Sequence, residues 1–129
     1  MIPVPPTVLV VDDTPSIRFL IRTNLELAGF EVVEATDGQD CLDILAGAER
    51  LPDVVTMDMV MPRMDGVTAI TRIRADRRYD DVRLVMVSTQ SQQIDINRAA
   101  AAGVHEYVIK PFDPDVLVET VRRVLESRG

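Results

Sequence analysis

The chain has 129 residues, a formal net charge of −7 at pH 7 and one cysteine. This length fits a single domain with one hydrophobic core. The acidic balance argues against direct contact with nucleic acid, and a lone cysteine excludes an intramolecular disulfide. No apolar run approaches the roughly 20 residues that cross a membrane, and the N-terminus has no basic secretion signal. We therefore expect a cytoplasmic protein without membrane insertion.

Five short apolar runs alternate with five segments of helical periodicity, which predicts five strand–helix repeats. In chain order we expect strand 8–11, helix 15–28, strand 31–35, helix 38–46, strand 54–57, a helix around 67–73, strand 84–87, helix 92–102, strand 107–109 and a helix around 117–125. Repeats of this kind form a parallel sheet with helices on both faces. The prediction is one α/β domain over residues 1–129.

Residues at the expected helix starts, and the composition of the fourth helix, predict how these helices begin and pack. Thr14-Pro15 is typical of a helix N-cap followed by proline at the first helical position. Asp65-Gly66 is typical of a turn at the start of a helix. The fourth helix is rich in alanine and offers only Ile94, Ile96 and Ala99 as apolar contacts, so we expect it to be the least firmly packed element.

Three other features are expected to have structural or solvent-facing roles. Four arginines in segment 72–78 are interleaved with aspartates, which favours a solvated face over a phosphate-binding one. Cys41 lies among apolar residues of the second helix and should be a buried thiol. His105, the only histidine, should lie in a loop, because no nucleophile stands beside it in sequence.

Charged residues stand directly after three of the expected strands. Asp12 and Asp13 follow the first strand, Asp58 follows the third and Lys110 follows the fifth. Ligands of open α/β sheets bind beyond the carboxyl ends of the strands, where the strand order reverses. Right-handed crossovers would place the first strand beside the third, so we expect the three carboxylates to face one another across one crevice.

These residue types favour a metal-assisted phosphoryl-transfer site. Three carboxylates at close range stay ionised only beside a cation, and oxygen donors without histidine or cysteine favour Mg²⁺ or Mn²⁺ over zinc. Lys110 would add a second positive charge, and Ser88 would offer a hydroxyl at the end of the fourth strand. In such a site a carboxylate attacks phosphorus while the cation and the lysine neutralise the phosphoryl oxygens.

The same residues, in this order, resemble the receiver domains of two-component response regulators, in particular the single-domain, chemotaxis-regulator-like members. The resemblance extends over about residues 7–125. It rests on Asp12-Asp13, Asp58, the MPRMDG loop at 61–66, Ser88-Thr89, Tyr107 and Lys110-Pro111-Phe112. It implies a flavodoxin-like, five-stranded parallel sheet of order 2-1-3-4-5 with five helices on both faces.

The resemblance also implies a chemistry. Asp58 would be the phosphoacceptor, supplied by a phosphohistidine on a sensor histidine kinase, by a phosphotransfer protein or by a small phosphodonor. Asp13, Asp58 and the main-chain carbonyl of Val60 would bind Mg²⁺ (or Mn²⁺) directly, and Asp12 would act largely through water. The protein would catalyse its own phosphorylation and dephosphorylation and would not otherwise be an enzyme. Val60 and Gln90 offer no acid to orient a hydrolytic water, so we expect a phosphoryl lifetime that is not especially short.

A conformational switch is implied as well. Ser88 would turn toward the phosphoryl group, Tyr107 would change rotamer with it, and Lys110 and Pro111 would be joined by a cis peptide. An acyl phosphate adds about 1.5 to 2 negative charges at one point, which can bias such an equilibrium. The output surface would consist of the fourth helix, the fifth strand and the fifth helix, where a downstream target protein would bind.

Other functions fit parts of the pattern. Haloacid-dehalogenase-like phosphotransferases need a second aspartate two residues after the nucleophile, where this chain has Val60. A flavodoxin-like flavin carrier needs a phosphate loop after the first strand, where Asp12 and Asp13 would repel the phosphate. The N-terminal receiver of a longer DNA-binding or enzymatic regulator remains an alternative, although we expect a stand-alone regulator.

Overall fold

Five parallel strands form one sheet in the computed structural model, which describes residues 4–127. The order is β2-β1-β3-β4-β5. The strands are β1 (Thr7–Val11), β2 (Glu31–Ala35), β3 (Val54–Met57), β4 (Arg83–Ser88) and β5 (Glu106–Ile109). The helices are α1 (Pro15–Leu27), α2 (Gly38–Gly47), α3 (Gly66–Ala75), the 3₁₀ helix η1 (Arg77–Tyr79), α4 (Gln93–Ala102) and α5 (Pro114–Glu126). Residues 1–3 and 128–129 of the expected 1–129 domain lie outside the described residues.

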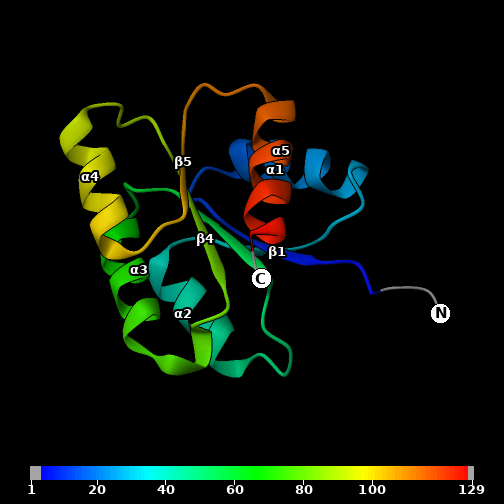
Figure 1. Cartoon of the computed structure of the whole chain (residues 1–129), viewed down its shortest axis with the longest axis horizontal. Helices are drawn as coiled ribbons and strands as arrows, with labels where there is room; N and C mark the ends of the chain where they lie inside the picture. The colour runs from blue at the N-terminus through cyan, green and yellow to red at the C-terminus, as the bar shows by residue number, and fades with distance from the viewer. Residues whose placement is uncertain (1–3, 128–129) are drawn as a thin grey trace.

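The helices form two layers, with α1 and α5 on one side of the sheet and α2, α3 and α4 on the other (Figure 1). Each layer has its own core. Leu9 and Val11 of β1 face α2 and α3, whereas Val8 and Val10 face α1 and α5. Since successive strand residues point to opposite faces, a strand covered on both sides must be apolar throughout, as β1 is.

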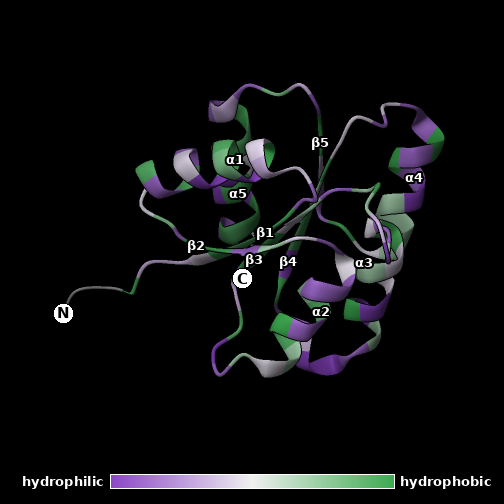
Figure 2. Cartoon of the chain, turned by 180° about the vertical axis from the view of Figure 1, so that it is seen from behind, coloured by the Kyte–Doolittle hydropathy of each residue, from purple (hydrophilic) through white to green (hydrophobic). Residues whose placement is uncertain are grey.

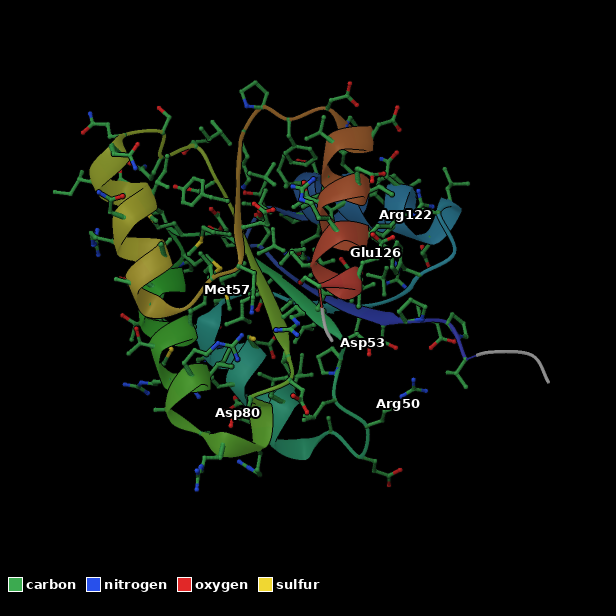
Figure 3. All side chains as sticks on the ribbon, in the orientation of Figure 1. Arg50, Asp53, Met57, Asp80, Arg122 and Glu126 are labelled. Carbon is green, nitrogen blue, oxygen red and sulfur yellow. The ribbon has the colours of Figure 1, made fainter. Side chains whose placement is uncertain are left out.

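The helices are amphipathic, which Figure 2 shows as alternating purple and green segments along their ribbons. In α5 the buried residues include Leu117, Val121 and Val124, as the helical spacing predicts. Figure 3 shows Met57 near the middle of the molecule, whereas Arg50 projects at its edge. The side chain of Met57, the last residue of β3, is fully buried under the layer formed by α2, α3 and α4. Among residues 4–127, no helix has the length and apolar character needed to cross a membrane.

The expected sheet order and elements are confirmed, with strand ends within about one residue of the predicted positions. Asp65 caps α3 by accepting the N–H of Thr68 at 2.8 Å, which confirms the predicted start signal. Thr14 is the N-cap residue of α1 and Pro15 is its first residue, which confirms the predicted helix start. The Thr14 side chain makes no capping hydrogen bond, and the main-chain N–H of Thr14 donates to the Asp12 carboxylate at 2.9 Å.

Two expectations need correction. Ile94 was expected among the few apolar contacts of α4, but its side chain is 65% exposed and Ala99 is the buried residue of that helix. Arg74 was expected on a solvated face, but its guanidinium is partly buried and donates to the main-chain oxygens of Tyr79 and Val82 at 3.0 and 2.6 Å. It joins α3 to the chain before β4, which the charge pattern alone does not reveal.

Candidate functional site

Three carboxylates meet at the carboxyl end of the sheet, as predicted. Asp12 and Asp13 follow β1, and Asp58 follows the neighbouring strand β3, where its N–H donates to the Val11 carbonyl at 3.0 Å. One carboxylate oxygen from each residue lies within 4.8 Å of the other two. The parallel pairing of β1 with β3 therefore brings together residues that stand more than forty positions apart in sequence.

The environments of the three acids differ. Asp12 is 1% exposed and Asp58 is 9% exposed, whereas Asp13 is exposed at the rim. Burial raises the pKa of the Asp58 carboxyl, Lys110 opposes this rise, and the negative charges of Asp12 and Asp13 add to it. The raised pKa means that the ionised carboxylate is disfavoured in this position, and a bound cation would relieve that cost.

Lys110 projects into the same cluster from the end of β5. Its Nζ donates to Asp12 Oδ2 at 2.7 Å and lies 3.5 Å from Asp58 Oδ2. The main-chain N–H of Lys110 donates to the Ser88 carbonyl at 2.8 Å, which fixes this residue to the end of β4. The peptide between Lys110 and Pro111 is cis, as the resemblance implied.

The loop from Asp58 to α3 folds tightly beside the acids. The N–H of Gly66 donates to the Met59 carbonyl at 2.8 Å, and a Cβ at Gly66 would collide with the main-chain oxygen of Asp58. Only glycine permits this close return of the chain. Met59, Met61 and Met64 pack into the core, which leaves Val60 exposed on the cleft side.

Ser88 and Tyr107 meet at one loop residue. The Ser88 hydroxyl oxygen accepts the N–H of Gln90 at 3.1 Å, and the Tyr107 hydroxyl donates to the Gln90 carbonyl. Ser88 is fully buried, and Tyr107 is half-buried. Burial raises the pKa of the Tyr107 hydroxyl, and the nearby Ser88 side chain opposes that rise. Thr89, the next residue, is the one that lines the cleft.

A cleft of about 530 Å³ opens over the acids. Asp13, Asp58 and Lys110 lie on its polar side. Its apolar side is formed by Ile17 and Leu20 of α1 and by Pro111 and Phe112 after β5. We did not predict this apolar wall from the sequence. The apolar residue Leu20 could have indicated it, because it extends the apolar face of α1 toward the site.

A family model described as the response regulator receiver domain matches residues 8–122. The chain belongs to the response regulator receiver domain family. It is therefore a phosphoacceptor response regulator of two-component signalling, and its acidic cluster lies where receiver domains bind Mg²⁺.

Receiver relatives include short and long proteins. The chain is 36% identical over 118 residues to a chemotaxis protein CheY homolog of Campylobacter jejuni, covering 91% of this chain and 90% of that protein. It is 36% identical over 121 residues to the DNA-binding transcriptional regulator RpaA of Synechocystis, covering 93% of this chain and 49% of RpaA. The structure of Vibrio cholerae chemotaxis protein CheY4 is similar with a TM-score of 0.87 and 32% identity, over 94% of this chain and 99% of that one.

Proposed function

We propose that Asp58 is the phosphoacceptor and takes a phosphoryl group from a histidine kinase or phosphotransfer protein in a Mg²⁺-dependent reaction. The observation that carries this proposal is the meeting of three carboxylates within 4.8 Å with the Lys110 ammonium among them, at the base of an open cleft. The protein would act as a single receiver domain over residues 1–129.

Asp58 is better placed to react than the other two acids. Both carboxylate oxygens of Asp12 accept hydrogen bonds, Oδ1 from the Thr14 N–H and Oδ2 from Lys110, and its side chain is 1% exposed. Asp13 is exposed at the rim of the cluster. Asp58 lines the cleft, so its carboxylate is accessible to an incoming phosphorus. Its Oδ2 lies 3.5 Å from Lys110 Nζ, which is longer than the contact between Lys110 and Asp12.

The donor set fits Mg²⁺ or Mn²⁺, because it consists of oxygen ligands with no histidine or cysteine among them. Asp13, Asp58 and the main-chain carbonyl of Val60 would hold the ion, with Asp12 acting through water. When bound, the ion supplies positive charge that offsets the charge on the phosphoryl oxygens.

The side chains of Asp58 and Lys110 would carry out the phosphoryl transfer itself. A carboxylate oxygen of Asp58 attacks phosphorus, the bond from phosphorus to the donor imidazole nitrogen breaks, and an acyl phosphate forms. Lys110 donates hydrogen bonds to the transferred group as a point charge. Ile17, Leu20 and Phe112 form the apolar wall beside the reacting carboxylate.

The response would pass through Ser88 and Tyr107 to the output surface. Both side chains bind Gln90, so a turn of Ser88 toward the phosphoryl group would release Tyr107 to another rotamer. Tyr107 lines a groove of about 290 Å³ between α4 and β5, together with Ile96 and Ile109. A downstream target protein would bind at this surface of α4, β5 and α5.

Chemotaxis relatives that match this chain over nearly their whole length support a single-domain role in that type of pathway. A longer DNA-binding form, as in RpaA, is less well supported. We place the protein in the cytoplasm, where phosphotransfer from a kinase would occur.

The proposal is tested by intact mass after incubation with acetyl phosphate, with and without Mg²⁺, beside Asp58→Asn. We expect a Mg²⁺-dependent gain of one phosphoryl group in the wild-type protein and none in the variant. An equal gain in Asp58→Asn would show that another residue is the acceptor. No gain with acetyl phosphate or with a panel of phosphorylated histidine donors would contradict the proposed activity.

A further inference from the structure

The loop after Asp58 contains an uncommon turn. Among residues 4–127, Arg63 is the only residue other than glycine with a positive φ, at 65°. The N–H of Met64 donates to the Pro62 carbonyl at 2.7 Å, which closes a three-residue turn around Arg63. Such turns with positive φ at the centre are rare and strained for residues that carry a Cβ. Glycine would fit the backbone better, so the arginine side chain must contribute something else.

That side chain makes a two-point ion pair with Asp37. Arg63 Nε and one terminal nitrogen bind the two oxygens of Asp37 at 2.7 and 2.9 Å. The Asp37 side chain is 7% exposed and also caps α2 by accepting the Asp40 N–H at 2.8 Å. The Arg63 guanidinium, as the largest influence, holds the pKa of the Asp37 carboxyl below its usual range. Asp37 is thus fixed from two sides.

The turn is directly connected to the proposed metal site. The loop is closed at its base by the bond from Gly66 to Met59, and Met61 and Met64 are anchored in the core. Val60 is three residues before Arg63 and lies on the cleft side, where its carbonyl would serve as a ligand. The ion pair ties this short loop to the start of α2, a rigid element outside the site.

We infer that the Arg63–Asp37 ion pair is a positioning device for the metal-binding loop, which holds the turn in the geometry that aims the Val60 carbonyl at the cation. This inference rests on the proposed function of the site. It assigns Arg63 a role without contact to the metal or the phosphoryl group. Bidentate arginine–carboxylate pairs suit this purpose, because they fix orientation as well as distance.

The experiment measures Mg²⁺ affinity by isothermal titration calorimetry at 25 °C for wild type, Arg63→Gln, Asp37→Asn and the double variant. Asparagine at position 37 retains the ability to cap α2. Arg78→Gln is the matched control, since Arg78 is similarly exposed and pairs with Asp76 at 3.0 Å. Circular dichroism confirms that each variant is folded.

We expect either single substitution to weaken Mg²⁺ binding by about tenfold, the lower end of the loss seen when a ligand's supporting partner is removed. The double variant should lose no more Mg²⁺ affinity than either single variant, because each single substitution already breaks the same Arg63–Asp37 ion pair. Saturating Mg²⁺ should restore the rate of phosphorylation by acetyl phosphate, and Arg78→Gln should match the wild type.

Arg63→Gln is decisive. Simple electrostatics predicts tighter Mg²⁺ binding when a positive charge is removed from the neighbourhood, whereas loss of a positioning device predicts weaker binding. An unchanged or tighter affinity in Arg63→Gln would overturn the inference, as would fully additive losses in the double variant. If the wild-type protein itself bound no Mg²⁺, the metal dependence of the proposed function would fail and the inference with it.

Discussion

His105 illustrates how a single residue links charge to stability. Its Nδ1 accepts the N–H of Leu84 at 3.0 Å, so the ring joins the loop before β5 to β4. Its position in a loop, away from the acid cluster, confirms the expectation from sequence. Partial desolvation lowers the pKa of the His105 imidazole, and the positive charges of Arg74 and Arg83 lower it further.

This environment predicts a pH dependence of stability. In the unfolded chain the His105 imidazole has a pKa near 6.5, whereas in the folded protein its pKa is lower. As the pH falls below about 6.5, the unfolded chain therefore takes up a proton before the folded protein does. The stabilising contribution is therefore present above about pH 6.5 and is lost as the pH falls through that value toward the folded pKa. We expect a larger fall in Tm between pH 8 and pH 5.5 for the wild type than for His105→Asn.

Both proteins would be compared without Mg²⁺ by differential scanning calorimetry. The carboxylates titrate in both of them, so the difference between the two pH profiles isolates the imidazole. Identical profiles would mean that His105 titrates in the folded protein as it does in the unfolded chain.

At the scale of elements, the helices differ in how they are held. Helix α5 buries Leu117, Val121 and Val124 among its contacts, and α1 packs against both α5 and β2. Helix α4 buries only Ala99, and Ile94 points into solvent. The alanine-rich sequence predicted this weak packing, although it did not predict which of the apolar residues would be exposed.

Weak packing predicts local opening. We expect amides 97–101 of α4 to exchange with deuterium at least about tenfold faster than amides 21–25 of α1, because few apolar contacts oppose opening. Both segments are internal turns of helices, so their hydrogen bonding is matched. Native-state exchange followed by NMR gives the comparison. Slower exchange in α4 than in α1 would contradict the packing argument.

At the scale of the whole molecule, stability and function compete at the acid cluster. Two apolar cores support a site where two buried carboxylates, the exposed carboxylate of Asp13 and one lysine lie close together. Without a cation, the negative charges repel one another and the buried Asp58 is incompletely compensated, as its raised pKa indicates. In the proposed function, a bound cation would offset this cost.

Removing one charge should therefore stabilise the metal-free protein. We expect Asp58→Asn to raise Tm in EDTA by about 4 °C, the shift that about 1 kcal/mol produces in a domain of this size. Mg²⁺ at 100 times its Kd should stabilise the wild type by about 2.7 kcal/mol and the variant by less, since the variant lacks a carboxylate ligand. Thermal unfolding with and without Mg²⁺ measures both effects. Ser127→Ala, remote from the cluster, is a control that should respond like the wild type.

Much of this protein was determined by local sequence. Alternation of apolar runs and helical segments gave the α/β class, because burial on both faces requires strands that are apolar throughout. Acids and a lysine placed just after strands located the site, since parallel strands bring their carboxyl ends to one edge. The sheet order came from the resemblance to receiver domains, as no local pattern encodes which strands are neighbours.

Tertiary structure alone decided the contacts between distant segments. Arg63 and Asp37 lie 26 positions apart, and Arg74 reaches the chain before β4, so nothing in their neighbouring residues distinguishes them from solvated charges. The apolar wall of the cleft likewise combines α1 with residues after β5. Periodicity and residue type report which face of an element is buried, whereas the partner of a charged side chain depends on how the elements pack. For that reason the meeting of the three acids and the lysine was predictable from sequence, and the interactions of Arg63 and Arg74 were not.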